Sequence, residues 1–171
     1  MSGSFRDDFV ELFDGQFHRL YRYIDRACGD PELAADIAQE TFVKLYQRGS
    51  LPDTPGAWLV TVATNLLRNA QNTRTRRSRL LKVVPDAETF SDRPITPAHA
   101  TASRELQRRV RTALDQMPER ERQLLLLRAE GYSYKEIAQA LELQETSVGT
   151  LLARAKRAFR DIYEDKSNAS H

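Results

Sequence analysis

Apolar residues recur at helical spacing along most of the chain, which predicts an all-α protein. The first clear helix begins with Asp30 and Pro31, an N-cap followed by a proline in the first turn, and its apolar pattern stops at Gly49. These signals predict a helix over residues 31–48 with a single buried stripe. The positions of that stripe are Ala34, Ile37, Ala38, Thr41 and Leu45.

A second helix start follows at Thr54 and Pro55, and the apolar pattern after it predicts a helix over residues 55–72. The two faces of this helix differ in character. One face carries Leu59, Val62, Ala63, Leu66 and Ala70, and the other carries Trp58, Thr61, Asn65, Arg68 and Asn72.

The segment VVPDAETFSDRPITPAHA interrupts the helical pattern near the middle of the chain. Its prolines prevent a continuous helix, and its apolar residues follow no period. We therefore expect two small helical domains, over residues 1–82 and 101–171, joined by a flexible linker over residues 83–100.

Helical spacing resumes in the second half, where Pro118 opens one helix and Gly131 is placed to end it. Ser133 and Glu136 then form the S-x-x-E pattern of a capping box. In a capping box, the side chain of each of the two residues accepts a hydrogen bond from the backbone N–H of the other. A short helix over residues 134–141 is the expected result.

The last helix is basic and amphipathic, and it follows the short helix after only a few residues. Two such helices form a helix-turn-helix, the motif that places its second helix in the major groove of DNA. An ordinary helical hairpin remains the alternative for this segment alone. The expected buried stripe is Val148, Leu152, Ala155, Phe159 and Ile162, and the expected outer face is Ser147, Thr150, Leu151, Arg154 and Arg157.

Composition narrows the class of protein. The 171 residues are 40% hydrophobic and 29% charged, with no apolar run near the roughly 20 residues that cross a bilayer and no signal-peptide pattern, so we expect a cytoplasmic protein without membrane insertion. Cys28 is the only cysteine, and the histidines lie far apart in sequence. No metal site, cofactor or catalytic motif is expected, so the chain is not predicted to be an enzyme.

The net charge of +2 conceals two segments that contain bases but no acids, residues 66–82 and 146–160. An isolated run of charge is usually a solvated face, but solvated faces commonly mix signs. Two separate basic patches instead indicate two contacts with a polyanion such as DNA.

Several stretches resemble the bacterial sigma factors of the extracytoplasmic-function (group 4) type. DIAQETFVKLY, residues 36–46, is similar to the family's region 2.2, and PGAWLVTVATNLLRNAQNTRTRR, residues 55–77, to its regions 2.3 and 2.4. Residues 113–141 followed by SVGTLLARAKRAF, residues 147–159, resemble regions 4.1 and 4.2. The resemblance covers nearly the whole chain except the linker.

This resemblance implies a transcription initiation factor that binds the RNA polymerase core, through its β′ and β subunits, and reads the −10 and −35 elements of promoter DNA. It also implies an anti-sigma factor as a partner, and we expect that partner to pack between the two domains. The residues expected to bind the polymerase β′ coiled coil are Asp36, Gln39, Glu40 and Lys44.

Aromatic stacking combined with cationic phosphate contacts suits a single-stranded segment, and the helix over residues 55–72 carries both. The residues expected at the −10 element are Trp58, Asn65, Arg68, Asn69, Arg74, Arg76 and Arg77. Those expected at the −35 element are Ser147, Thr150, Leu151, Arg154, Lys156 and Arg157. The family captures a flipped base with the loop that corresponds to residues 50–54.

Two departures from the family pattern stand out. Glu142 occupies a turn position often filled by glycine, so either the turn differs or a non-glycine residue adopts a left-handed conformation at a cost of about 1–2 kcal/mol. Early in the last helix, Gly149, Leu151 and Ala153 replace longer donors, so we expect Arg154 to discriminate between bases.

Two other classes of function stay open from the sequence. A two-domain helix-turn-helix regulator that is not a sigma factor would bind duplex DNA as a free protein and form no stable complex with core polymerase. A helical scaffold protein does not explain why two acid-free basic segments fall on successive outer faces.

Overall fold

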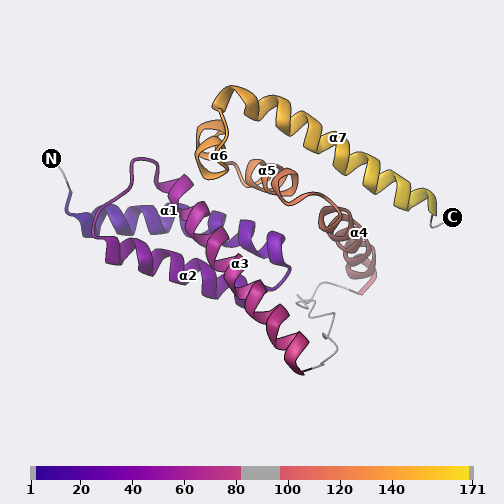
Figure 1. Ribbon diagram of the computed structural model, residues 1–171, viewed down its shortest axis with the longest axis horizontal. Helices are drawn as coiled ribbons and strands as arrows, with labels where there is room; N and C mark the ends of the chain where they lie inside the picture. The colour runs from indigo at the N-terminus through magenta and orange to yellow at the C-terminus, as the bar shows by residue number, and fades with distance from the viewer. Residues whose placement is uncertain (1–2, 82–96, 170–171) are drawn as a thin grey trace.

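The computed structural model describes residues 3–81 and 97–169, and within these ranges every regular element is a helix (Figure 1). The all-α prediction is confirmed for the described residues. Helices α1, α2 and α3 contact one another in a first bundle, and helices α4 to α7 form a second. Their bounds are α1 Phe5–Cys28, α2 Pro31–Arg48, α3 Pro55–Leu81, α4 Pro97–Asp115, α5 Glu119–Ala129, α6 Tyr134–Ala140 and α7 Glu145–Ala169.

Helices α1 and α2 begin and end on local backbone signals. Ser4 caps α1, and Asp30 caps α2 by accepting a hydrogen bond from the backbone N–H of Leu33 at 3.1 Å. Each helix ends on a glycine in the left-handed region, with φ of 71° at Gly29 and 77° at Gly49. The predicted bounds of the helix over residues 31–48 are confirmed, and all of its predicted stripe residues are buried.

Helix α3 runs to Leu81, nine residues beyond the predicted end at Asn72. No glycine or proline interrupts the sequence there, and the Thr73 and Thr75 hydroxyls donate hydrogen bonds to carbonyls one turn back at 2.9 and 3.0 Å. The arginine run after Asn72 is therefore helical, and it is displayed along the end of α3.

The buried face of α3 is wider than predicted. Val60 and Leu67 are buried although neither was assigned to the apolar face, whereas Val62 and Leu66 are only half-buried. The reason is tertiary, because α3 contacts α6 of the second bundle as well as α1 and α2 of its own.

Helix α4 begins at Pro97, inside the segment predicted to be a linker over residues 83–100. Proline suits the first turn of a helix, where its missing N–H is not needed, so Pro97 opens α4 instead of preventing it. Residues 83–96 of the predicted linker, together with residue 82, lie outside the described residues.

The helix-turn-helix forms as predicted from α6 and α7. The capping box is complete: Ser133 Oγ accepts from the Glu136 N–H at 3.1 Å, and Glu136 Oε1 accepts from the Ser133 N–H at 3.0 Å. Gly131, with φ of 86°, follows the end of α5. Glu142 has φ of 56°, which confirms the left-handed alternative for the turn position.

One apolar core passes through both bundles. Leu20, Leu59 and Ala63 from the first bundle belong to the same buried cluster as Leu124 and Ile137 from the second. The two bundles are docked side by side (Figure 1). Across the ranges 3–81 and 97–169, no helix combines the length and apolar character needed to cross a bilayer.

Candidate nucleic-acid interface

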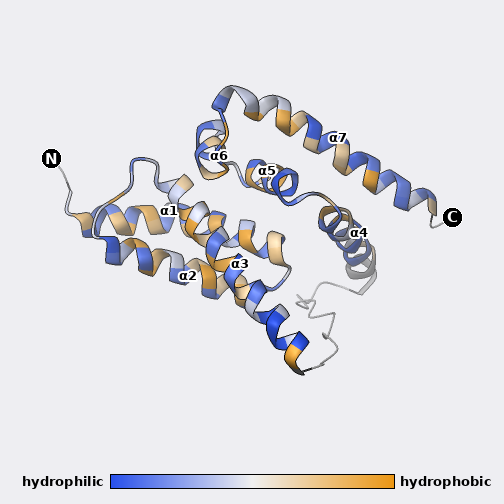
Figure 2. Ribbon diagram, in the orientation of Figure 1, coloured by the Kyte–Doolittle hydropathy of each residue, from blue (hydrophilic) through white to orange (hydrophobic). Residues whose placement is uncertain are grey.

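Helix α3 carries the first predicted DNA-reading face, and most of that face is accessible. Asn65, Arg68 and Asn69 are exposed, and Trp58 is half-buried against the core. The C-terminal part of α3 is strongly hydrophilic (Figure 2). The exposed arginines there are Arg74, Arg76, Arg77 and Arg79.

An open pocket of about 400 Å³ lies at the start of α3. It is bounded by the loop before α3 and by one face of its first two turns, so Trp58 both packs on the core and forms a wall of the pocket. The volume falls in the range of small-ligand sites in proteins. The lining residues are Arg48, Leu51, Pro52, Asp53, Thr54, Ala57, Trp58, Thr61 and Gln139.

Gln139 is a lining residue that the sequence analysis missed. It belongs to α6 of the second bundle, about 80 residues from the rest of the pocket. No local pattern marks it, because its position there depends on the docking of the two bundles.

Two arginines of α3 are already paired. Arg68 donates to Glu119 of α5 at 3.0 Å, and Arg74 donates to Asp30 at 2.7 Å. Burial opposes ionisation of Asp30, but the hydrogen bonds from Arg74 and from the Leu33 N–H outweigh it, so the pKa of this carboxyl lies below its ordinary value. Such half-exposed ion pairs are weak, so a phosphate can replace the carboxylates.

Helix α7 carries the second predicted DNA-reading face. Thr150, Arg154, Lys156 and Arg157 are exposed along it, and none of them lies in the buried stripe. Val148, Leu152 and Ala155 are buried as predicted, and Phe159 and Ile162 are half-buried against the core.

Two residues at the start of α7 that were expected on the outer face are only partly exposed. Leu151 is half-buried and packs against the core, and Ser147 is half-buried, so neither is fully on the outer face. A Cβ on Gly149 would lie 3.6 Å from the ring of Tyr134 in α6. This is an ordinary van der Waals distance, so the Tyr134 ring flanks Gly149 without excluding a side chain there. Thr150 is the first fully exposed residue of the predicted outer face.

The polar face of α2 is exposed as predicted. Asp36, Gln39, Glu40 and Lys44 all lie on the surface. Val43 and Tyr46 on the same helix are also exposed, at 52% and 56% of their surface.

Beside this polar face lies an apolar region, here called the aromatic surface, which the sequence analysis did not identify. Phenylalanines recur every four residues along α1, and their rings contact Phe42 and Tyr46 of α2 with centroid separations of 5.0–6.2 Å. The four-residue spacing was the available signal. The aromatic surface consists of the exposed or partly exposed Phe5, Phe9, Phe13, Phe17 and Tyr46, which lie around the buried ring of Phe42.

Both halves of the chain match described sequence families. Residues 13–77 match the family described as Sigma-70 region 2, and residues 107–159 match the family described as Sigma-70, region 4. The first match spans most of α1, all of α2 and most of α3, and the second contains the helix-turn-helix. Each match therefore contains one of the two basic faces.

Similar proteins extend over most of the chain. An RNA polymerase sigma-H factor of Pseudomonas aeruginosa is 32% identical, with 83% of this chain and 79% of the relative covered. RNA polymerase sigma factor CarQ of Myxococcus xanthus is 30% identical, with 93% and 89% covered. The ECF RNA polymerase sigma factor SigX of Bacillus subtilis is 26% identical, with 92% and 84% covered.

A solved structure has a similar fold. It contains the sigma factor RpoE of Bartonella quintana in complex with the anti-sigma factor NepR. The TM-score is 0.64 at 20% identity, and the alignment covers 92% of this chain and 97% of that one.

Proposed function

We propose that different helices of this chain contact RNA polymerase and the two promoter elements. The chain belongs to the extracytoplasmic-function group of the sigma-70 family, and it is a transcription initiation factor. It binds the RNA polymerase core and directs it to promoters, and it carries out no catalysis itself. Because it acts on RNA polymerase, we expect it to be located in the cytoplasm. One observation carries the proposal: two exposed basic helices, α3 and α7, stand in two bundles that match the two DNA-reading regions of the family.

The polymerase contact is assigned to α2. Asp36, Gln39, Glu40 and Lys44 form an exposed polar face on a helix whose opposite side is buried in the core. The neighbouring Val43 and Tyr46 add exposed apolar area to it. Stable interfaces combine an apolar centre with a polar rim, which is the arrangement found here.

The −10 contact is assigned to α3 and the pocket at its start. The arginines of α3 neutralise phosphates along the strand, and Asn65 and Asn69 offer both donors and acceptors to base edges. The pocket beside Trp58 receives an unstacked base, because it combines an aromatic wall with polar groups such as Asp53 and Thr61.

The −35 contact is assigned to α7. Arg154 is the first long donor on the accessible face and is suited to a bidentate contact with guanine in the major groove. Lys156 and Arg157 are suited to phosphates. Thr150 supplies a short donor or acceptor at the start of the helix.

An anti-sigma protein is proposed as the inhibitory partner. The aromatic surface and the exposed polar face of α2 leave apolar and charged groups uncovered, and the RpoE relative of known structure is bound to an anti-sigma factor. Co-purification from native cells under non-inducing conditions should recover this partner in a near-stoichiometric amount. Recovery of core polymerase alone would contradict the idea.

The initiation function is tested by reconstitution. Purified chain is added to core polymerase, and transcripts are measured from matched templates and from templates with scrambled −10 or −35 elements. Promoter-specific transcripts that disappear on the scrambled templates support the proposal. A free chain that binds duplex DNA specifically but forms no complex with core polymerase would instead identify a helix-turn-helix regulator.

A further inference from the structure

An arginine and a tyrosine lie exposed beside the start of α7, outside the helix that is proposed to read the −35 element. Arg128 is near the end of α5, and Tyr134 is the first residue of α6 with 41% of its surface exposed. Neither residue was predicted to contact DNA. A tyrosine combines an apolar ring with a polar tip, so an exposed one is suited to a contact in which its hydroxyl bonds a partner.

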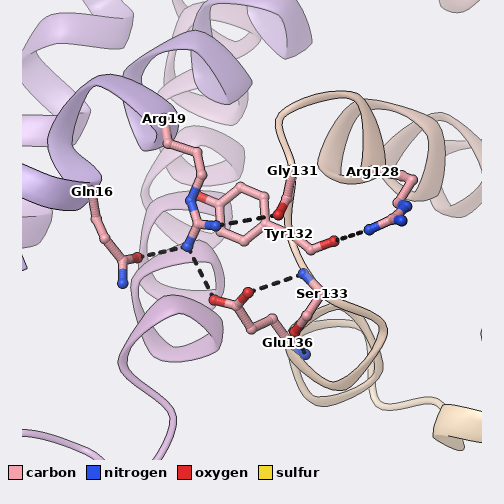
Figure 3. A network of polar contacts seen from close by, with 7 residues as sticks. All are labelled: Gln16, Arg19, Arg128, Gly131, Tyr132, Ser133 and Glu136. Carbon is pink, nitrogen blue, oxygen red and sulfur yellow. Dashed lines mark hydrogen bonds and ion pairs between the residues drawn. The ribbon is translucent and has the colours of Figure 1, made fainter.

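The Arg128 side chain is held in place by two neutral groups. Its guanidinium donates to the carbonyl of Tyr132 at 3.1 Å and lies 5.1 Å from the centroid of the Tyr134 ring. Figure 3 shows the hydrogen bond, with Arg128 on the side of Tyr132 that faces away from Arg19. Neither of these two contacts cancels the charge of Arg128. A guanidinium has five N–H donors, so the bond to one carbonyl leaves others for a ligand.

The tip of the Tyr134 ring lies against the first turns of α7. A Cβ on Gly149 would be 3.6 Å from Tyr134 Cε2 and 3.9 Å from the Tyr134 hydroxyl oxygen. Gly149 and Ala153 are four residues apart, so they share one side of the helix. The Tyr134 hydroxyl therefore lies beside the part of the predicted reading face where α7 has its shortest side chains.

The way a helix-turn-helix binds DNA places this pair of residues near the backbone. The second helix enters the major groove with its N-terminal residues at the base edges, while the first helix crosses the sugar-phosphate backbone. Here the second helix is α7, so the side chains that face bases belong to residues such as Thr150 and Arg154. Side chains displaced from α7 towards α6 and the end of α5 face a phosphate instead.

We propose that Arg128 and Tyr134 form a clamp for one backbone phosphate at the edge of the −35 element. The inference rests on the proposed function of α7 and adds two binding residues outside that helix. The Arg128 guanidinium pairs with a phosphate oxygen, and the Tyr134 hydroxyl donates a hydrogen bond to the same phosphate. A phosphate contact carries no base information but fixes the register of the protein on the duplex. The clamp thus positions α7 so that Arg154 meets its base.

The two side chains are suited to this contact because they are already ordered. Arg128 is held by the Tyr132 carbonyl and the Tyr134 ring, and that ring rests beside Gly149. Immobilising a long side chain on binding costs about 0.5–1.5 kcal/mol, and an ordered side chain avoids part of that cost.

The test uses the full chain bound to core polymerase and a labelled promoter duplex that this complex transcribes. The variants are Arg128→Gln, Arg128→Lys and Tyr134→Phe, with Arg6→Gln at an exposed position of α1 as the control for net charge. Tyr134→Phe keeps the ring and loses only the hydroxyl. Circular dichroism and titration with core polymerase check that each variant folds and forms the complex. Anisotropy at several salt concentrations gives the dissociation constants for the duplex.

Arg128→Gln is expected to weaken binding by about five- to tenfold on matched and scrambled −35 sequences alike and to reduce the salt dependence by about one unit. Arg128→Lys keeps the charge, so it should keep the salt dependence. Tyr134→Phe should weaken binding about threefold on both sequences without changing the salt dependence, because a neutral donor releases no counterion. Arg6→Gln should match wild type.

Duplexes in which single phosphates are replaced by uncharged methylphosphonates locate the contact. Replacing the clamped phosphate should weaken binding of the wild-type complex about fivefold but that of Arg128→Gln less than about twofold, because the partner of that phosphate is already gone. Replacing a phosphate elsewhere should affect the two complexes equally.

Two results would overturn the clamp. One is an Arg128→Gln complex that loses as much affinity as wild type on every methylphosphonate duplex. The other is a Tyr134→Phe complex that loses affinity only on the matched −35 sequence, which would make Tyr134 a base contact. A wild-type complex that does not distinguish matched from scrambled −35 sequences is a separate result, since it contradicts the proposed function of α7. Sensitivity to a single phosphate is measured independently of that preference, so either idea can fail while the other stands.

Discussion

The carboxylate of Glu136 occupies the space where a side chain at position 56 would begin: a Cβ on Gly56 would lie 1.9 Å from Glu136 Oε2. Glu136 cannot move away freely, because its other oxygen caps α6 and the same Oε2 accepts from Arg19. The absence of a side chain at residue 56 therefore allows the two bundles to meet.

Gly56→Ala is expected to destabilise the chain by about 1–3 kcal/mol, the usual cost of inserting a methyl group into a packed contact. The matched control is Gly15→Ala, in the middle of α1, where a new Cβ meets nothing within 4 Å. That control should gain about 0.5–1 kcal/mol from helix propensity. Urea unfolding measures both. Equal gains in the free energy of unfolding of the two variants would mean that the Glu136 side chain can move aside without a loss of stability.

Asp30 is expected to make stability depend on pH in the acid range. Its pKa in the folded chain lies below the ordinary value of 3.8, so its contribution is complete above that value and is lost as pH falls through the folded pKa. Asp30→Asn keeps a capping oxygen but loses the charge that pairs with Arg74. The stability of wild type should exceed that of this variant by up to about 1 kcal/mol at pH 7, and the difference should shrink as pH falls below 3.8 and through the lowered pKa of Asp30.

The same unfolding experiment can contradict this assignment. A stability difference between wild type and Asp30→Asn that stays constant from pH 7 to pH 2.5 would show that the Arg74 pair contributes nothing that titrates.

Reversing charge at Asp36 and Glu40 together should weaken binding to core polymerase by about tenfold or more, because rim charges steer and orient such contacts. Both side chains are exposed, so circular dichroism should be unchanged. The control reverses Glu164 and Asp165, which gives the same change of net charge at the exposed end of α7. Titration with labelled polymerase gives the dissociation constants. A loss of helix content would show that this face supports folding.

Arg154→Ala should cost about 1–3 kcal/mol at the −35 element and relax its sequence preference, because a bidentate contact to a base is lost. Arg157→Ala should weaken binding to all sequences and reduce the salt dependence by about one unit. Footprinting with polymerase at two salt concentrations separates these outcomes. Equal loss on matched and scrambled −35 sequences would make Arg154 a phosphate contact.

Glu142→Gly should stabilise the helix-turn-helix. The residue adopts φ of 56°, a conformation that costs a non-glycine residue about 1–2 kcal/mol and costs glycine little. The gain is partly offset by the greater freedom of glycine in the unfolded chain, so a net increase of up to about 1 kcal/mol is expected. Gln144→Gly, in the same turn with ordinary backbone angles, should lose stability. Thermal unfolding compares the stability of the two variants. A lower stability of Glu142→Gly than of wild type would show that the backbone at residue 142 is not strained.

The sequence by itself determined the features that depend on short-range signals. The start and end of α2 and the capping box of α6 follow from residues within one turn of each other, and each is present in the structure. The same holds for the exposed Arg154 and Arg157 of α7, because helical spacing fixes which residues share a side. The arginines of α3 after Asn72 lie beyond the predicted helix. At Glu142 the sequence left two alternatives open, and the structure selected the left-handed one. Helix type and register need only local chemistry.

Other features were decided only by tertiary structure. Val60 and Leu67 are buried and Leu151 is half-buried against the core, and their surroundings depend on elements that a helical period does not specify. Gln139 joins the pocket beside Trp58, and Arg19 meets Glu136 across 117 residues of sequence, by the same docking of the two bundles. Amphipathic spacing predicts that a face is buried but does not name its partner, because apolar burial is non-directional. The partner is selected by shape and charge at the contact, where Gly56 gives the space and the arginines of α1 give the complementary charge.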